Sequence, residues 1–191
     1  MRLRDVEESD AEAYVRMRCD PVMMAELGGP LPKERVVERL RNEVREAAED
    51  RSWIRMIVVP DGAGPGEAVA GGIALWSHES HESRESRESR GSNEDGGAAI
   101  SEIGWMVLPE YQGRGLAKAA VRQLLDQAAR DGRWGSVHAF PAVTNGPSNG
   151  ICRALGFRLL GEREVDFADR VLHCHHWVVE PGEHAGSGTD K

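Results

Sequence analysis

The sequence predicts a single mixed α/β domain in which amphipathic helices are interspersed with short β-rich segments. Its 191 residues suit one compact domain, a size at which about two-thirds of the unfolded surface becomes buried. Some segments repeat apolar residues every three to four positions, which indicates helices. Others concentrate β-branched residues between turn formers, which indicates strands. We therefore expect one domain over residues 1–180 and a disordered tail at 181–191.

Charge and composition argue against several functional classes. The chain has 32 acidic and 24 basic side chains, a net charge of −8, which opposes binding to the phosphates of a nucleic acid. No apolar run approaches the roughly 20 residues that span a bilayer, and Met1–Asp5 lacks the apolar core of a signal peptide. Cys19, Cys152 and Cys174 are widely spaced and odd in number, as expected of reduced thiols. We expect a cytoplasmic protein with no nucleic-acid partner and no membrane partner.

The first part of the chain predicts a strand, two helices and a hairpin. Apolar positions from Val36 to Ala48 recur at helical spacing among many charged residues, the pattern of an amphipathic helix. Further on, two β-rich runs flank a segment of glycine, proline and aspartate, residues that favour a turn. The expected elements are a strand at 1–4, a helix that ends before Asp20, a helix at 33–50, and strands at 53–59 and 69–76.

A low-complexity insertion follows at residues 77–97. It contains no apolar residue and repeats a triplet that ends in Glu-Ser, so it cannot bury a core. A helix there would place like charges such as Glu82 and Glu85 beside each other. We therefore expect a flexible, solvated segment. His78 and His81 could bind a metal, but we interpret them as solvated linker residues.

The second part of the chain predicts alternating strands and helices. Val121, Leu124 and Ala128 fall on one stripe of a helix that Gly132 should end. The remaining segments are short β-rich runs and one short helix bounded by glycine. The expected elements are a strand at 99–108, a helix at 115–130, a strand at 137–140, a helix at 148–155, and strands at 157–165 and 171–179.

The most informative segment joins the strand at 99–108 to the next helix. Gln112-Gly113-Arg114-Gly115 precedes a first helical turn, whose N–H groups have no partner within the helix and carry partial positive charge. Glycine lets the backbone approach a ligand closely, and Arg114 adds a charged donor. The loop is therefore a candidate phosphate site, although an ordinary strand-to-helix turn would use glycine in the same way.

Two motifs resemble the GNAT superfamily of N-acetyltransferases. Gln112–Ala117 matches its Gln/Arg-x-x-Gly-x-Gly/Ala loop, and Glu102–Tyr111 resembles the fourth strand that leads into that loop. Asn145–Ser148 and Gly156-Phe157 are similar to motifs of the branch that acetylates ribosomal-protein N-termini. The resemblance covers nearly the whole chain except the insertion and the tail. It implies a mixed, mostly antiparallel sheet that is splayed between its fourth and fifth strands and flanked by helices.

The resemblance also implies acetyl-coenzyme A as cosubstrate, with no metal. The pyrophosphate would bind backbone amides of the loop, and the pantetheine arm would pair with the end of the fourth strand. Val107 would polarise the thioester carbonyl. Met106 and Val107 could instead be strand core, and Asn145 a turn or cap residue. The implied cofactor-binding residues are Trp105, Met106, Val107, Gln112, Gly113, Arg114, Gly115, Leu116, Ala117, Lys118 and Asn145.

Glu102 is the expected general base, since it matches a fourth-strand glutamate that has this role in some members of the family. Acetyl transfer needs a neutral amine, and an ordinary amine is largely protonated at neutral pH. Glu102, Gly104 and Met106 should share one strand face, so the missing side chain of Gly104 leaves space for an acceptor. The alternative is a solvated edge glutamate, because other relatives place the base on the fifth strand, where Phe140 stands.

The proton donor to the leaving thiolate is less well defined. Many relatives carry a tyrosine where this sequence has Cys152, a residue that could donate a proton or be inert helix core. Ser148 matches the serine of the Asn-x-x-Ser motif, a donor proposed for the ribosomal-protein branch, but it could instead cap the helix. Catalysis without a donor is also open. The candidate catalytic residues are Glu102, Ser148 and Cys152.

A dense cluster of histidine and cysteine lies at residues 173–176. On a strand, His173 and His175 would face one way and Cys174 and His176 the other, which argues against a shared metal ion. We interpret the cluster as a strand end or a wall of the acceptor site. His138 carries no signal of its own.

The sequence thus predicts an enzyme that transfers acetyl from acetyl-CoA to a primary amine, either a protein N-terminus or a small molecule such as an antibiotic. We expect a monomer or a homodimer. One alternative is a non-catalytic, acetyl-CoA-binding regulatory module, and another is an α/β domain with no cofactor. The motifs do not define the acceptor, because loops and early helices build its pocket.

Overall fold

The structure of the chain is a computed structural model that describes residues 1–61, 66–77, 100–167 and 170–184. The insertion predicted at 77–97 lies outside these residues except for Ser77. Within the described ranges, no helix is long and apolar enough to cross a membrane. The chain divides into two compact units, and strands β3 and β4 and helix α3 contribute residues to both.

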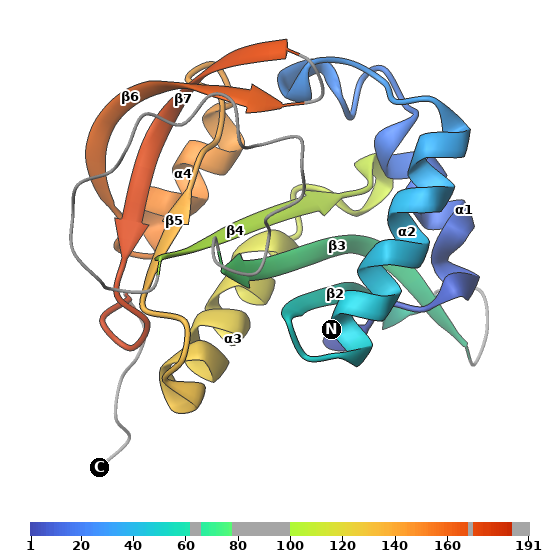
Figure 1. Cartoon of the computed structure of the whole chain (residues 1–191), viewed down its shortest axis with the longest axis horizontal. Helices are drawn as coiled ribbons and strands as arrows, with labels where there is room; N and C mark the ends of the chain where they lie inside the picture. The colour runs from blue at the N-terminus through green and yellow to red at the C-terminus, as the bar shows by residue number, and fades with distance from the viewer. Residues whose placement is uncertain (62–65, 78–99, 168–169, 185–191) are drawn as a thin grey trace. The chain divides into compact units, whose positions relative to one another are not determined.

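The fold is mixed α/β, as the sequence predicts (Figure 1). Within the described residues, the strands form a seven-stranded sheet in the order β1-β2-β3-β4-β5-β7-β6. β4 and β5 run parallel, whereas β1–β2, β5–β7 and β6–β7 are antiparallel. The strands are β1 Arg2–Asp5, β2 Ser52–Pro60, β3 Glu67–Ser77, β4 Ile100–Val107, β5 Ser136–Ala139, β6 Arg158–Phe167 and β7 Arg170–Val179. The helices are α1 Ala11–Arg18, α2 Lys33–Ala48, α3 Leu116–Asp131 and α4 Gly146–Ala154, with 3-10 turns η1 Glu8–Asp10, η2 Ala25–Leu27 and η3 Pro109–Tyr111.

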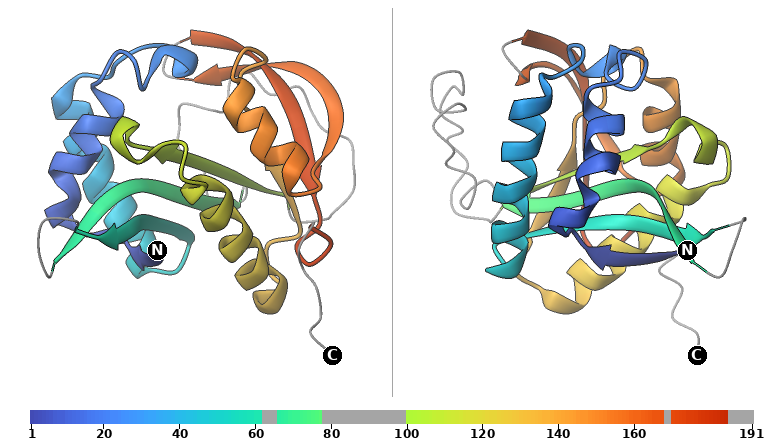
Figure 2. Two further views of the ribbon diagram at one scale, coloured as in Figure 1. Left: turned by 180° about the vertical axis from the view of Figure 1, so that it is seen from behind. Right: turned by 90° about the vertical axis from the view of Figure 1, so that its right-hand side faces the viewer.

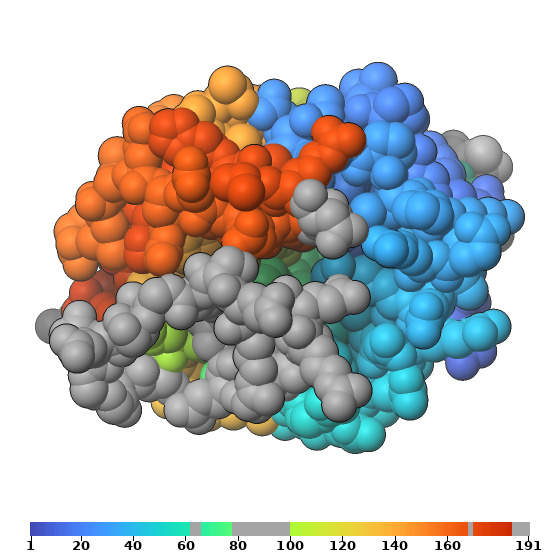
Figure 3. Space-filling view, turned by 45° about the horizontal axis from the view of Figure 1, so that its top comes forward, coloured from blue at the N-terminus to red at the C-terminus, as the bar shows by residue number. Residues whose placement is uncertain are grey.

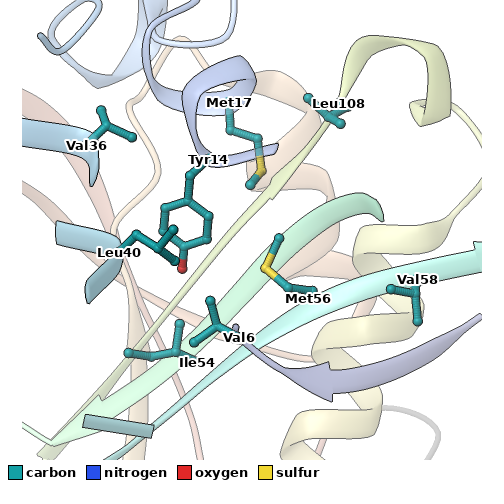
Figure 4. Close-up of a cluster of buried hydrophobic side chains, with 9 residues drawn as sticks. All are labelled: Val6, Tyr14, Met17, Val36, Leu40, Ile54, Met56, Val58 and Leu108. Carbon is teal, nitrogen blue, oxygen red and sulfur yellow. The ribbon is translucent and has the colours of Figure 1, made fainter. Parts of the chain in front are cut away.

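The first unit comprises Met1–Leu75 and Gly104–Val121. Its helices α1 and α2 lie side by side (Figure 1). From the apolar stripe predicted for α2, Val36 and Leu40 are buried in one core with residues of β2. Fully burying one such apolar side chain contributes about 1.5–3 kcal/mol to stability. The core of this unit consists of Val6, Tyr14, Met17, Val36, Leu40, Ile54, Met56, Val58 and Leu108 (Figure 4).

A buried ionic network joins α1 to α2. Glu43 accepts hydrogen bonds from the Tyr14 hydroxyl and from Arg39 Nε, both at 2.5 Å, and Arg18 Nη2 lies 3.8 Å from the same carboxylate. Burial alone would raise the pKa of Glu43, but Arg39 and Arg18 outweigh burial, so the pKa is lowered. Glu43 is therefore held as a carboxylate, and its hydrogen bond from Tyr14 and its ion pair with Arg18 join α2 to α1.

β3 and β4 approach each other closely at Gly71. A β-carbon there would collide with the backbone oxygen of Met106, so only glycine fits. Just beyond β4, the N–H of Leu108 donates to the oxygen of Ala70 at 2.9 Å. This close pairing fixes the end of β4, where the candidate phosphate loop begins.

The second unit comprises Trp76–Ile103 and Arg122–Lys191. In it, Ile100–Glu102 of β4 pairs with Ser136–His138 of β5, and β7 pairs with both β5 and β6. Helix α4 lies against β7 (Figure 2), where side-chain hydrogen bonds join the two. β6 is the outermost strand and is exposed along most of its length, as its surface in Figure 3 shows.

The chain after β7 packs further than the sequence predicts. The Glu183 N–H donates to the Glu180 oxygen at 3.0 Å. The side chain of His184 is buried, and its Nε2 lies 3.1 Å from Oδ1 of Asp126 in α3. Packing thus continues beyond residue 181, where the tail was expected to begin, and residues 185–191 lie outside the described ranges.

Candidate active site

The loop between β4 and α3 belongs to the first unit and has a defined backbone. The Gln112 N–H donates to the Pro109 oxygen at 3.1 Å, which closes η3. Gly113 and Gly115 follow with φ values of 73° and 72°, in the left-handed region that strains any residue with a side chain. Among the described residues, no atom lies within 4 Å of the position that a β-carbon of either glycine would take. The loop is therefore open to a ligand.

A run of backbone donors is the main chemical feature of this loop. The first hydrogen bond of α3 is donated by Ala119 to the Gly115 oxygen, at 3.0 Å. Among the residues that the structure describes, none accepts a hydrogen bond from the N–H groups of Gly113 to Lys118. These donors lie at the positive end of the helix dipole, where an anion is stabilised. These backbone donors are thus available to an anion, and the phosphate site at this loop stays a prediction.

Two side chains of the loop hold its backbone instead of pointing into open space. Gln112 Nε2 donates to the Val107 oxygen at 2.9 Å, which ties the loop to the end of β4. Arg114 Nη2 donates to the Glu110 oxygen at 2.9 Å, and its guanidinium carbon lies 5.4 Å from the centre of the Tyr111 ring. Both side chains therefore support the loop conformation.

The last residues of β4 are half-buried. Of those predicted to bind the pantetheine arm, Met106 packs against the core of the first unit, as the strand-core interpretation required. Trp105 and Val107 are also half-buried, and the Val107 oxygen is occupied by Gln112. The end of β4 thus serves both as a wall of the core and as the start of the loop.

Glu102 lies at the other end of β4, in the second unit, and is half-buried. It pairs with His138 of the parallel strand β5, so the two side chains share one face of the sheet. Cys174 is on the same face. Burial raises the pKa of Cys174 to about 11, and the charge of Glu102 contributes to the shift. The predicted base therefore faces titratable groups of β5 and β7.

The predicted Asn-x-x-Ser motif forms the N-terminus of α4. Asn145 is the N-cap, and its Oδ1 accepts a hydrogen bond from the Ser148 N–H at 3.0 Å. The suggestion that Ser148 caps the helix is therefore wrong, because α4 begins before Ser148, at Gly146. Ser148 is half-buried. Cys152 is fully buried, and burial raises its pKa to about 12, consistent with helix core.

Sequence reasoning missed Asn149, which connects three parts of the second unit. Its Nδ2 donates to the oxygens of Ala142 and Asn145 at 2.9 and 2.8 Å. Its Oδ1 accepts from Trp177 Nε1 at 2.9 Å and lies 2.8 Å from His175 Nδ1. No local pattern marks such a residue, because its partners are spread over the loop before α4, the N-cap of that helix and strand β7.

Sequence reasoning also missed the role of His138, which forms a pair with His176. His138 Nδ1 lies 2.6 Å from His176 Nε2, and its other nitrogen, Nε2, lies 3.2 Å from Ser136 Oγ. Phe140 stacks on the pair, with 4.6 Å between its ring centre and that of His176. The guanidinium carbon of Arg163 lies 5.6 Å from the Phe140 ring centre. His138 pairs with Val178, and the alternation predicted for residues 173–176 places His176, two residues earlier on β7, on the same sheet face.

The other two histidines of the cluster lie on the opposite face of β7. His173 Nε2 is 2.9 Å from Glu162 Oε2, and His175 contacts Asn149. Among the described residues, no group of three or more histidine, cysteine, aspartate or glutamate side chains is arranged to hold a metal ion. The cluster thus divides into two pairs with different partners.

Comparison with known proteins identifies the family. The profile of the acetyltransferase (GNAT) domain matches residues 1–158. The chain belongs to the GNAT family. The resemblance to the GNAT family is thereby confirmed, and membership makes the chain an acyltransferase of the acetyl-CoA-dependent class.

Solved GNAT structures share the fold. Aminoglycoside acetyltransferase AAC(6')-Ib in complex with coenzyme A has a TM-score of 0.68 at 16% identity, over 93% of both chains. Spermidine N-acetyltransferase from Vibrio cholerae, in complex with CoA and spermine, has a TM-score of 0.67 at 17% identity, over 95% of both chains. The acetyltransferase from Salmonella typhimurium that modifies the N-terminal serine of ribosomal protein L7/L12 has a TM-score of 0.66 at 14% identity, over 93% of both chains. The TM-scores show that the fold is shared, and identities this low leave the acceptor of this chain open.

Proposed function

We propose that this GNAT protein transfers the acetyl group of acetyl-CoA to a primary amine. The observation that carries the proposal is the run of N–H groups from Gly113 to Lys118, which has no acceptor among the described residues. A pyrophosphate would satisfy these donors at the positive end of the α3 dipole, and coenzyme A contains a pyrophosphate. Gly113 and Gly115 keep the approach to the donors free of side chains.

The remaining cofactor contacts follow from the family resemblance. The pantetheine arm would lie along Trp105–Val107, with a backbone group of Val107 polarising the thioester carbonyl. Gln112 and Arg114 would support the loop through the hydrogen bonds described above. Asn145 would also contact the cosubstrate. Because its Oδ1 already caps α4, this contact would have to leave the hydrogen bond from the Ser148 N–H in place. No step of this chemistry requires a metal.

Glu102 is the proposed general base. The ammonium form of the acceptor must lose one proton before its nitrogen can attack the thioester carbonyl. The C–N bond then forms and the C–S bond breaks, with the electron pair left on sulfur. Ser148, half-buried at the start of α4, is the proposed donor to that thiolate. Cys152 is the weaker candidate because it is fully buried with a raised pKa.

The acceptor is a protein N-terminus or a small amine, and we propose that the protein acts in the cytoplasm as a monomer or homodimer. Three probes represent the acceptor classes: a peptide that begins with serine, spermidine and kanamycin. Calorimetry with acetyl-CoA tests the binding site, and the release of free coenzyme A thiol with each probe tests the reaction. We expect binding and release with at least one probe. Binding without release would indicate a regulatory module, and absence of binding would overturn the proposal.

A further inference from the structure

The second unit contains a chain of hydrogen-bonding groups that the proposed chemistry has not used. It runs from His176 through His138 to Ser136, with separations of 2.6 Å between the two ring nitrogens and 3.2 Å from His138 Nε2 to Ser136 Oγ. His138 uses both ring nitrogens in this chain. His176 uses only Nε2, and no described residue hydrogen-bonds to its Nδ1.

One arrangement of protons satisfies the chain and leaves a base at its end. If His176 Nε2–H donates to His138 Nδ1, then His138 Nε2–H donates to Ser136 Oγ. His176 Nδ1 then holds a lone pair. Burial lowers the pKa of both histidines, to about 4 for His176, and the charge of Arg163 lowers them further. Both rings are therefore neutral at neutral pH, and the lone pair of His176 Nδ1 is the acceptor at the end of the chain.

The pair lies on the sheet face that carries the proposed base. Glu102 pairs with His138 across β4 and β5, and alternation along β7 places Cys174 and His176 on that face. Arg163 of β6 pairs with Cys174 and faces the same side. Among the described residues of this unit, the charged or titratable groups that face the pair are Glu102 from β4, Arg163 from β6 and Cys174 from β7, and Ser136 of β5 adds a hydroxyl.

We infer that the His138–His176 pair, together with Ser136, accepts the second proton that the acceptor nitrogen loses and carries it to solvent; this inference rests on the proposed acetyl transfer. Glu102 takes the first proton, which makes the amine nucleophilic. As the C–N bond forms, the nitrogen becomes cationic and its remaining proton more acidic, so a neutral imidazole can take it. His176 Nδ1 receives that proton, the Nε2 proton moves to His138 Nδ1, and the His138 Nε2 proton leaves through Ser136 to water.

The proton count of the reaction agrees with this division. An ammonium has three protons on nitrogen and the amide product keeps one. Of the two that are lost, the one held by Glu102 replaces the proton that Ser148 donates to the sulfur of coenzyme A, and the one taken by His176 reaches solvent. The electron pair of the broken C–S bond stays on sulfur and binds the proton from Ser148. Each turnover thus releases one proton, and the histidine chain is its route.

Chemical rescue of His176→Ala tests the inference. The probe is the acceptor among the serine peptide, spermidine and kanamycin that wild type acetylates fastest, and thiol release is followed at pH 7. We expect the rate to fall about 10- to 100-fold, the range of a lost proton-transfer group that water partly replaces. Added imidazole should restore much of the rate. Pyrazole has the same ring size but is a far weaker base, and it should restore none.

Two further variants separate proton transfer from packing. His176→Gln keeps a donor for His138 Nδ1 and should bind acetyl-CoA as wild type does, yet lose rate to a similar extent. His173→Ala, on the opposite face of the same strand, should keep the wild-type rate. Equal rescue by imidazole and pyrazole, or wild-type rates in both His176 variants, would overturn the relay while acetylation by wild type still supported the proposed function. A wild type that acetylates none of the probes would overturn both.

Discussion

Two regions of the molecule provide different kinds of chemical group. The loop at Gly113–Lys118 provides backbone donors, whereas the histidine face, which is the sheet face that carries His138 and His176, provides side chains. The loop presents consecutive backbone N–H groups, exposed at the start of one helix. The histidine face presents half-buried side chains from separate strands, with His138 and His176 separated by 38 residues in sequence. A site built from consecutive residues can be recognised as a sequence motif. A site built from residues far apart in sequence cannot, because the strand alternation shows only which residues share a face and not which residues of other strands lie beside them.

Substitutions in the two regions should therefore have different effects. The loop depends on backbone torsion and on an open approach, so the identity of its side chains matters less than the glycines. The histidine face depends on which nitrogen holds a proton and on neighbours that keep the rings neutral. Substitutions in the loop should alter affinity for acetyl-CoA, and those on the face should alter rate and pH dependence.

The largest expected effect is that of Glu102→Gln, which keeps the shape of the side chain and removes the base. The rate constant at neutral pH should fall by about 10²–10⁴-fold, with acetyl-CoA affinity near wild type. Raising the pH should rescue the variant partly, because the amine then deprotonates without help. Rate measurements from pH 6 to about 10 check this. Equal rates for both proteins at every pH, with chemistry rate-limiting, would remove Glu102 from the mechanism.

Gly115→Glu tests the loop. The substitution forces a side chain into a left-handed conformation with φ of 72° and adds negative charge where the pyrophosphate should bind. We expect a roughly 10- to 100-fold loss of affinity, the equivalent of one or two hydrogen bonds to a charged group. Calorimetry with acetyl-CoA measures it, and Lys118→Ala, which leaves the backbone unchanged, is the milder comparison. Unchanged affinity in a folded Gly115→Glu protein would contradict the phosphate assignment.

Features that depend on neighbouring residues could be predicted from the sequence, and features that depend on contacts between distant residues could not. Helical and strand periodicity located the elements within a few residues, because each depends on local spacing, and the loop was visible because its donors are consecutive. Gly71 gave no signal, since the reason for glycine is the backbone of Met106 on another strand. The hydrogen bonds of Asn149 and the contact between His138 and His176 were equally invisible. Both require the strand register, which no local pattern specifies.

The dependence of folding stability on pH tests the histidine face without any ligand. Folding lowers the pKa of His176 to about 4, so between pH 6.5 and about 4 the unfolded chain binds more protons than the folded one, and the lowered pKa of His138 acts in the same direction. Stability that is present above pH 6.5 is lost as pH falls through that range. We expect His176→Gln to lose roughly 1–2 kcal/mol less than wild type between pH 7 and 5, after allowance for solvent screening. Urea unfolding at both pH values checks this, and parallel losses would contradict it.

The smallest expected effect separates capping from catalysis at the start of α4. Asn145→Ala removes the side-chain oxygen that accepts the Ser148 N–H at 3.0 Å, and should cost about 1 kcal/mol of stability. Ser148→Ala leaves that hydrogen bond in place, because it uses the backbone N–H, and should change stability by less than about 0.5 kcal/mol. If the Ser148 hydroxyl protonates the leaving thiolate, its loss should lower the rate without rescue at high pH, unlike Glu102→Gln. Thermal unfolding and rate measurements on both variants check this contrast. A larger stability loss in Ser148→Ala than in Asn145→Ala would contradict the assignment of the cap.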